Sequence, residues 1–267
     1  MNVPLEVQVM KDDIAKILFW DTEITPLLLV KFDLKPEYVR PANIVQDFFF
    51  ISAQWGWAGD DKVYDTNILD DPKRFAANHT DDYHVIKTIH DVLNEADIVV
   101  AHNGDGFDMP KFLDRCSYHK LKPLKQLQFV DTLKEARRIG YTSRSLAYLC
   151  EHLSLTRKLE NDYGAFKLAA LGDKKAIKNI VEYGRGDIPT LKDLYYRLLP
   201  FMKSHPNLNL YREDGEQGCP HCGSTHFIKK EKVYLKSGVY QGYMCKETKC
   251  GKRFRGKTRI KSVEMMP

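Results

Sequence analysis

The chain has 267 residues, of which 43% are hydrophobic and 29% are charged, an ordinary composition for a globular protein. This length allows one large domain, or one domain with a small additional module. The longest apolar stretch near the N-terminus, residues 27–30, is too short to cross a bilayer, and the first twenty residues lack the pattern of a secretory leader. We therefore expect a cytoplasmic protein.

The net charge of +5 is unevenly distributed along the chain. Residues 1–211 contain 28 Lys and Arg against 30 Asp and Glu, whereas residues 212–267 contain 13 against 6. A segment this basic favours a polyanionic partner, of which nucleic acid is the commonest. Charge alone is equally compatible with an ordinary solvated surface.

The hydrophobic patterning predicts strands first and helices later. Apolar, β-prone runs predict strands at 14–20, 44–57 and 61–68, with a proline-containing connection over 21–43. The later pattern predicts, in chain order, a helix over 81–95, a strand over 97–101, a helix over 109–120, a strand over 128–130, and helices over 132–139, 145–153 and 173–202. Ser143 or Ser145 is expected to cap the helix at 145. Gly184, Gly186 and Pro189 are expected to interrupt the last helix.

This order of elements predicts an α/β domain in which helices flank a mixed β-sheet. We expect the domain to occupy residues 1–211, because the segments 205–209 and 212–218 have the polar, Pro- and Gly-containing composition of linkers. A small module would then occupy residues 212–267.

Two carboxylates lie at the end of the first predicted strand. Asp21 and Glu23 are two residues apart, so their side chains point to the same face of the strand. Sites form at the carboxyl ends of strands in α/β sheets, and close carboxylates repel each other unless a cation such as Mg²⁺ joins them. A polar strand end before a turn would explain the same two residues without a site.

Two further polar segments follow. Residues 103–110 come after a buried strand and open a helix, where Asp108 is either a site carboxylate or a helix cap. Asp105 ranks below it, because the glycines around it predict the tip of a turn. Tyr183 and Asp187 are four residues apart on a predicted helix and so share one face, although an ordinary amphipathic surface gives the same spacing.

The three segments together resemble the motifs of DEDDy-type 3′–5′ exonucleases, a family that includes the proofreading domains of family A and B DNA polymerases. The matching residues are Asp21-x-Glu23, Asn103-x-x-x-Phe107-Asp108-x-Pro110 and Tyr183-x-x-x-Asp187. The second segment is most similar to family B, and residues 130–137 also resemble a segment that recurs between the second and third motifs. The resemblance covers residues 13–200 and implies an RNase H-like fold. No polymerase domain follows in the sequence, so we expect a stand-alone exonuclease, with or without a separate replication or repair partner.

The resemblance implies phosphodiester hydrolysis with two Mg²⁺ or Mn²⁺ ions. The implied ligands are Asp21, Glu23, Asp108 and Asp187, with Asp21 shared by both ions. Tyr183 would position the attacking water, because a phenol with a pKa near ~10 is a poor base at neutral pH.

Other residues near the motifs have expected supporting roles. Asn103 and Phe107 are expected to position the terminal nucleotide, and Arg185 to meet a phosphate. Core packing of Phe107 and a solvated Arg185 are the alternatives. Asp131 is expected to cap a helix or to support the site as a nearby carboxylate, and His102 to make structural hydrogen bonds.

Four cysteines near the C-terminus have the spacing of metal ligands. Cys219 and Cys222 form one pair, Cys245 and Cys250 form another, and 22 residues separate the pairs. Four thiolates bind Zn²⁺ tetrahedrally and can hold together a module that is too small for its own core. We therefore expect a zinc ribbon with one structural Zn²⁺ and a β-hairpin over residues 226–243.

The ribbon carries the basic character of the chain. Residues 229–261 contain 12 Lys and Arg but only 2 Glu, and aromatic residues lie among them. Cations beside aromatic rings are typical of nucleic-acid binding, whereas docking on the catalytic domain or on a protein partner is the alternative.

The activity that these residues favour is hydrolysis of DNA from single-stranded 3′ ends. An exoribonuclease on the same fold remains open, because this chemistry does not itself distinguish DNA from RNA. A catalytically silent nucleic-acid-binding module is the alternative from another class, and the presence of all four carboxylates argues against it. A structure-specific endonuclease is the third alternative.

Overall fold

The computed structural model describes residues 14–31, 39–155 and 163–262. Among these residues, no helix combines the length and the apolar character needed to cross a membrane. The first thirteen residues, where no leader is expected, lie outside the described residues.

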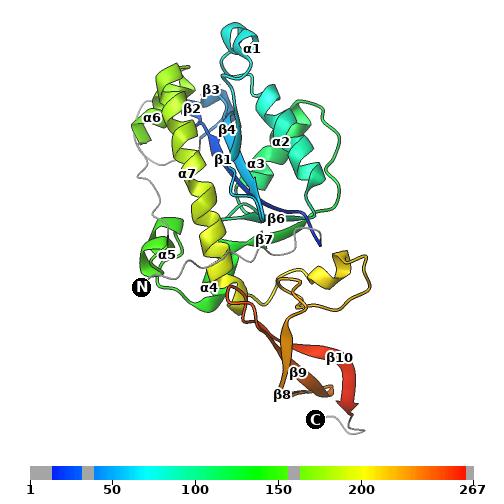
Figure 1. Cartoon of the computed structure of the whole chain (residues 1–267). Coiled ribbons are helices and arrows are strands. Elements are labelled where there is room, and N and C mark those ends of the chain that lie inside the picture. The colour runs from blue at the N-terminus through cyan, green and yellow to red at the C-terminus, as the bar shows by residue number, and fades with distance from the viewer. Residues whose placement is uncertain (1–13, 32–38, 156–162, 263–267) are drawn as a thin grey trace, which may run out of the picture.

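A five-stranded mixed sheet forms the centre of the fold, with the strand order β5-β4-β1-β6-β7 (Figure 1). Its strands are β1 (Ile17–Ile24), β4 (Phe50–Trp57), β5 (Tyr64–Asn67), β6 (Ile98–Ala101) and β7 (Gln128–Asp131). β1 pairs antiparallel with β4 and parallel with β6, which in turn pairs parallel with β7. The expected mixed sheet is therefore confirmed, and the strand that carries Asp21 and Glu23 lies at its centre.

Helices cover both faces of this sheet, as expected (Figure 1). They are α1 (Pro72–Ala77), α2 (Tyr83–Glu95), α3 (Asp108–Tyr118), α4 (Thr132–Ile139), α5 (Leu146–His152), α6 (Tyr163–Ala170) and α7 (Lys174–Leu198), with short 3-10 turns η1 (Pro41–Asn43), η2 (Leu199–Phe201) and η3 (Leu208–Tyr211). Ser145 caps α5 by accepting a hydrogen bond from Tyr148 N at 3.3 Å, so one of the two predicted caps is confirmed. α1 was not predicted; it is short and begins at a proline behind the capping Asp71.

The expected interruption of the last helix is wrong, because α7 continues through 25 residues. Asp173 caps its N-terminus, where Ala176 N donates to Asp173 Oδ1 at 2.7 Å. Buried side chains recur along the whole helix, from Ala176 to Leu198. This packing outweighs the lower helix propensity of Gly and Pro, because most helix stability in proteins comes from a buried face.

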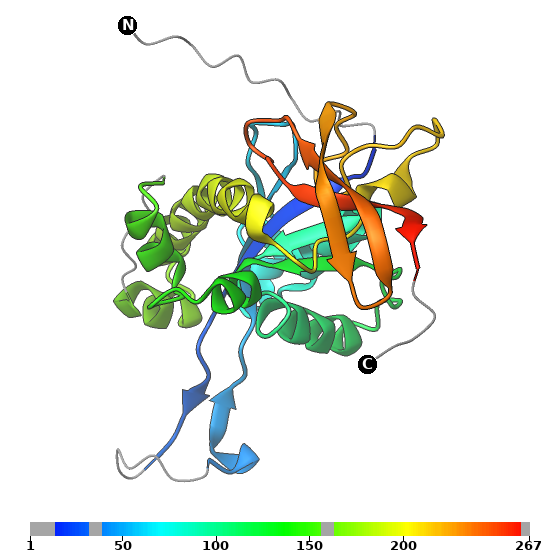
Figure 2. The same cartoon turned by 90° about the horizontal axis from the view of Figure 1, so that it is seen from below.

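The predicted strand over 44–57 is also wrong in its extent. It divides into β3 (Ile44–Gln46) and β4, and β3 pairs antiparallel with β2 (Leu28–Leu29) inside the expected connection. These two short strands form an arm that projects from the body (Figure 2). The exposed hydrophobic side chains of the arm are Leu27, Leu29, Val30, Ile44 and Val45.

A second, antiparallel sheet lies near the C-terminus and contains β8 (Phe227–Leu235), β9 (Gly238–Cys245) and β10 (Arg253–Lys261). We call it the C-terminal sheet; the hairpin expected over 226–243 corresponds to β8 and β9, whereas β10 was not predicted. The segment before it packs at the amino end of β1, where a Cβ added to Gly223 would meet Ile14 Cδ1 at 2.4 Å. Leu208 N also donates to Pro220 O at 2.9 Å.

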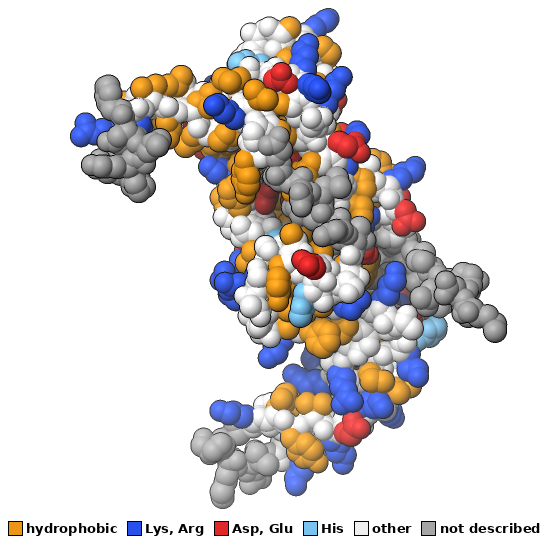
Figure 3. Space-filling model, turned by 90° about the vertical axis from the view of Figure 1, so that its left-hand side faces the viewer, with side chains coloured by type: hydrophobic (Ala, Val, Ile, Leu, Met, Phe, Trp, Pro, Cys, Tyr) orange, Lys and Arg blue, Asp and Glu red, His pale blue; other side chains and the backbone are white. Residues whose placement is uncertain are grey.

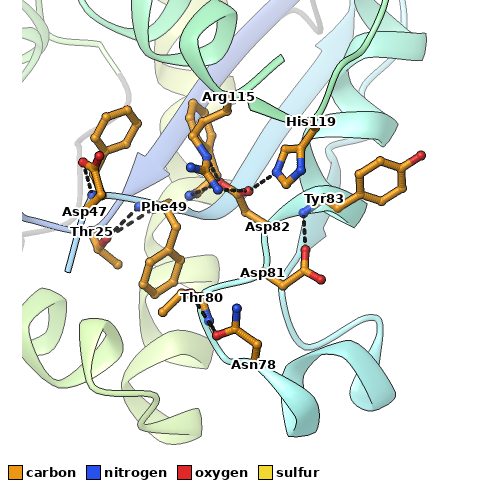
Figure 4. A network of polar contacts seen from close by, with 12 residues as sticks. Thr25, Asp47, Phe49, Asn78, Thr80, Asp81, Asp82, Tyr83, Arg115 and His119 are labelled. Atoms are coloured by element: carbon orange, nitrogen blue, oxygen red, sulfur yellow. Dashed lines mark hydrogen bonds and ion pairs between the residues drawn. The ribbon is translucent and has the colours of Figure 1, made fainter. Parts of the chain in front are cut away.

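A buried ion pair joins α3 to Asp82, the residue before the first turn of α2 (Figure 4). Arg115 of α3 donates from Nε and Nη2 to the two carboxylate oxygens of Asp82, at 2.8 and 2.7 Å. His119 Nε2 lies 2.6 Å from the same carboxylate, and Phe50 N donates to it at 3.0 Å. Asp82 is fully buried. Burial favours its neutral form, but the hydrogen bonds from His119 and Arg115 outweigh this and lower the pKa of Asp82.

Replacement of Asp82 by Asn should lower the free energy of unfolding by about 3–5 kcal/mol, because it leaves the buried Arg115 without its charge partner. A carboxylate with a lowered folded-state pKa stabilises the fold above its unfolded pKa of about 3.9, and this contribution is lost as the pH falls through the folded value. The difference between the two proteins should therefore shrink below about pH 4. Denaturant unfolding at pH 7 and pH 3 measures it.

Asp81→Asn is the matched control, since Asp81 pairs with the exposed Arg74. It should cost less than about 1 kcal/mol. An equal loss in the two variants would contradict the special role of the buried pair.

Candidate active site

Two carboxylates of β1 and one of α7 meet on the face of β1 that is covered by α7. Ligand oxygens of Asp21, Glu23 and Asp187 all lie within 4.8 Å of one another. Glu23 and Asp187 are buried and Asp21 is partly exposed, so the cluster opens to solvent on one side. Three carboxylates this close repel one another as anions, and a hard cation with oxygen ligands would remove that repulsion.

Strand β4 supplies polar neighbours to this cluster. Gln54 pairs with Asp21 and Ser52 pairs with Glu23 across the antiparallel ladder, and both polar side chains are fully buried. Gln54 Nε2 donates to Ser52 Oγ at 2.9 Å, while Gln54 Oε1 has no hydrogen-bond partner among the described residues. Neither residue was predicted, because the register of two strands is not visible in their separate sequences.

Gly184 of α7 lies directly over the amide of Gln54. A Cβ at this position would lie 2.6 Å from Gln54 Oε1 and 2.7 Å from Gln54 Cδ. The missing side chain therefore allows the helix to approach β4 closely, one turn before Asp187. The glycine expected to break the helix instead brings it close to the sheet.

Asp108 approaches the cluster from the other side of β1. It is the first residue of α3, and Thr22, between Asp21 and Glu23, donates a hydrogen bond from Oγ1 to Asp108 Oδ1. Burial raises the pKa of Asp108 to about 6; the Thr22 hydrogen bond opposes this shift, and repulsion by Asp131 adds to it. Asp108 is outside the group within 4.8 Å, so the structure places it beside the three carboxylates rather than among them.

Asp131 holds the loop that leads to Asp108. Its Oδ1 accepts hydrogen bonds from Leu133 N at 2.9 Å, Lys134 N at 3.3 Å and Asn103 N at 3.0 Å. The expected cap is confirmed, and the same oxygen also fixes Asn103. With a φ of 66°, Asn103 has the left-handed conformation that Asn tolerates better than most residues. A contact of its side chain with substrate stays a prediction.

Phe107 is 45% exposed, so the core-packing alternative is not supported. Arg185 is held by other side chains: its guanidinium donates to Asp65 Oδ2 at 2.8 Å and to Glu182 Oε2 at 3.0 Å. A phosphate contact of Arg185 would have to compete with this pairing. Tyr183 lies one turn before Asp187 on the unbroken α7 and is partly buried. These contacts leave the substrate roles of the three residues as predictions.

Asp105 and His102, which the sequence does not favour as site residues, make structural contacts. Asp105 pairs with Lys134 at the surface. His102 Nδ1 lies 2.9 Å from Thr132 Oγ1, and His102 Nε2 lies 2.9 Å from the carbonyl oxygen of Arg144. The expected structural hydrogen bonds of His102 are therefore confirmed.

The four predicted cysteine ligands meet at a second site, next to the C-terminal sheet. Their Sγ atoms lie within 4.8 Å of one another and are buried. The Sγ atoms of Cys219 and Cys250 are 3.6 Å apart, and those of Cys222 and Cys245 are 3.5 Å apart. The four residues belong to the same buried cluster as Ile17 of β1.

A comparison with protein-family models matches residues 62–199 to the RNase_H superfamily. This range covers more than half of the chain. The chain belongs to the RNase_H superfamily. The matched range includes Asp108, Tyr183 and Asp187, whereas Asp21, Glu23 and the four cysteines lie outside it.

The fold of this superfamily member is also similar to a solved structure, the family B DNA polymerase from the hyperthermophilic archaeon Pyrobaculum calidifontis. The TM-score is 0.51 at 16% identity, over 85% of this chain and 32% of the polymerase. The chain thus matches about a third of the polymerase, and an identity this low shows similarity of fold alone. No curated protein sequence matches the chain.

Gly184→Ala should lower the free energy of unfolding by about 1–3 kcal/mol, because the new methyl group would push the fully buried amide of Gln54 away from its hydrogen bond with Ser52. Thermal or denaturant unfolding measures the loss. Gly186→Ala, two residues later in the same helix, should leave stability equal or slightly higher. If Gly184→Ala were as stable as Gly186→Ala, the close approach of α7 to β4 would be refuted.

Proposed function

We propose that this RNase_H superfamily protein is a metal-dependent 3′–5′ exonuclease that hydrolyses phosphodiester bonds at single-stranded 3′ ends of DNA. The observation that carries the proposal is the meeting of Asp21, Glu23 and Asp187 within 4.8 Å, with Asp108 close by through Thr22. This arrangement joins the three sequence motifs at one end of β1.

The donor set fits hard divalent cations, because all its groups are carboxylates and the raised pKa of Asp108 reflects a buried carboxyl group that a cation would help to ionise. Two bound Mg²⁺ or Mn²⁺ ions would lower the pKa of a water molecule and offset the negative charge of the phosphate. Asp21, Glu23, Asp108 and Asp187 are the proposed ligands. Gln54 and Ser52 lie opposite Asp21 and Glu23 across the ladder.

The remaining residues of the site would orient the substrate. Tyr183, on the same helix face as Asp187, is proposed to hold the attacking water by a hydrogen bond rather than to remove its proton. Phe107 exposes an aromatic ring that can stack on the terminal base, and Asn103 lies on the same loop. Arg185 would reach a phosphate only by giving up contacts with Asp65 or Glu182.

DNA is favoured as the substrate because the similar fold is that of a DNA polymerase. RNA is the second candidate, since none of the proposed groups selects against a 2′-hydroxyl. A silent nucleic-acid-binding module is less favoured, because close carboxylates would hinder the approach of a polyanion unless a cation neutralised them. Binding to a separate replication or repair protein remains a further proposal.

The four cysteines are proposed to hold one structural Zn²⁺, so that residues 212–267 form a zinc ribbon beside a catalytic domain at 1–211. A Zn–S distance of about 2.3 Å places tetrahedral sulfur atoms about 3.8 Å apart, close to the 3.5 and 3.6 Å between the paired sulfurs. Thiolate ligands persist in a reducing compartment, which supports a cytoplasmic location.

The exonuclease proposal predicts that a 5′-labelled single-stranded DNA is shortened stepwise from its 3′ end, and only when Mg²⁺ or Mn²⁺ is added. Asp187→Asn should reduce the rate more than about 100-fold, since even changes to groups behind a metal ligand typically cost 10- to 100-fold. Asp193→Asn, exposed on the same helix and outside the carboxylate cluster, should stay close to wild type. Gel analysis of the products measures both.

A matched RNA substrate run in parallel tests the alternative substrate. Faster degradation of RNA would replace the proposal by an exoribonuclease. Binding of both strands without degradation of either would leave a binding module.

The zinc proposal predicts about one zinc per chain in the purified protein, measured by elemental analysis. Cys222→Ser should lose the metal and lower the melting temperature of the whole protein, because this cysteine belongs to the buried cluster shared with β1 and α7. Cys116→Ala, buried in α3 away from the sulfur cluster, should keep the metal. A zinc-free protein with an unchanged melting temperature would refute the site.

A further inference from the structure

One edge of the C-terminal sheet carries a row of arginines that the proposed hydrolysis does not use. On β10, Arg253 pairs with Met244, Arg255 with Gly242 and Arg259 with Tyr240. These three partners are alternate residues of β9, so the three arginines lie on the same face of the sheet even though an irregularity separates Arg255 from Arg259. All three are exposed.

The rest of this face favours an anionic ligand. Lys230 of β8 also pairs with Gly242, which adds a fourth cation, while Gly242 contributes no side chain between the strands. The guanidinium of Arg255 lies 4.2 Å from the ring centroid of the buried Tyr240. Glu231 lies 3.8 Å from Arg253, and both side chains are mostly exposed, so this pair neutralises little charge.

Figure 3 shows Lys and Arg side chains gathered over the C-terminal sheet. β10 is an edge strand, so the row lies along an open border of the sheet. Alternate residues of a strand are about 6.6 Å apart, which spaces the cations along a line rather than around a point. A linear polyanion fits a row of this kind better than a single phosphate does.

The position of this row relative to the carboxylates limits which substrates can reach it. Cys245, at the end of β9, belongs to the same buried cluster as Ile17 at the amino end of β1 and Leu198 of α7, whereas Asp21 and Glu23 lie toward the carboxyl end of β1. From Asp187 to Leu198, at the other end of α7, the helix rises about 16 Å, and from Asp21 to Ile14 an extended chain spans about 23 Å. Both spans end at the base of the C-terminal sheet, so roughly five to seven nucleotides, at about 3.4 Å per stacked nucleotide, is the least length that reaches it.

We propose that Arg253, Arg255 and Arg259 bind the backbone of single-stranded DNA upstream of the 3′ end that occupies the carboxylate site. The inference rests on the proposed function and extends it. Strands too short to reach β10 lose this contact, and longer strands bind more tightly. The row therefore makes affinity depend on strand length and on salt.

The test measures binding without hydrolysis. The full-length chain with Asp187→Asn is titrated against 5′-fluorescein-labelled oligo-dT of 4 and 20 nucleotides, and fluorescence anisotropy is recorded between 50 and 200 mM salt. The row is removed by Arg253→Gln, Arg255→Gln and Arg259→Gln together. The matched control, Lys73→Gln with Lys175→Gln and Lys178→Gln, removes the same charge from exposed positions of the body.

We expect the arginine variant to bind the 20-mer roughly 10- to 100-fold more weakly and to lose most of the affinity difference between the 20-mer and the 4-mer. The salt dependence, plotted as log K against log salt, should become shallower by about 2, which corresponds to three contacts at about 0.7 each. An equal effect of the lysine control would mean general attraction by net charge and would overturn the proposal. Unchanged binding of the 20-mer would also overturn the proposal, and an acidic protein would then be the partner that fits the arginines.

Two further variants keep the result interpretable. Arg253→Gln alone alters the residue farthest from Tyr240 and should give a smaller loss of the same kind if the triple variant does not fold. Replacement of all three by Lys should restore most of the affinity, since the charge is kept. Because anisotropy does not require cleavage, failure of the exonuclease proposal would appear separately, as intact DNA in the wild-type reaction.

Discussion

The close approach of α7 to β4 is the constraint on which the candidate site depends. Gly184 rests on the buried amide of Gln54, and Asp187 lies one turn further along the same helix. Three carboxylates resist being brought together, so the free energy for their meeting comes from elsewhere. Apolar burial along the whole of α7 supplies it, since each buried aliphatic side chain contributes about 1.5–3 kcal/mol. A hydrophobic interface thus holds the helix that carries Asp187 against the strand that carries Asp21 and Glu23.

Much of this arrangement follows from local rules that the sequence displays. Alternation in a strand places Asp21 and Glu23 on one face, and helical spacing does the same for Tyr183 and Asp187. The cap formed by Asp131 needs only its neighbours in the chain. These features could be predicted because each depends on a few consecutive residues.

The remaining features depend on contacts between distant segments. In the sequence, Gln54 is one polar residue in an aromatic strand. Only the register of the sheet shows that it lies opposite Asp21. The sequence predicts that Gly184 interrupts the helix, because nothing in its own segment indicates that the side chain of Gln54 packs against it. The split of the run 44–57 and the existence of β10 depend in the same way on strand pairing, which local propensity does not determine.

The chain becomes basic near residue 212, but the buried core continues across this point. The sulfur atoms of Cys219 and Cys245 share one buried cluster with Phe19 of β1 and Tyr195 of α7. Lys252 Nζ also donates a hydrogen bond to the carbonyl oxygen of Met202. A domain boundary at residue 211 stays a prediction. The packing across it joins Cys245 of the C-terminal sheet to the buried cluster between β1 and α7.

The arm formed by β2 and β3 has a consequence for how this chain tolerates insertions and deletions. β1 carries Asp21 and Glu23 and runs on toward the arm only a few residues later. Loss of one residue within β1 would turn both carboxylates to the opposite face of the sheet, away from Asp187. The arm, by contrast, carries none of the site carboxylates, so a change of length there leaves the register of β1 against β4 unchanged. We therefore expect related chains to keep the length of β1 and to tolerate changes of length in the arm.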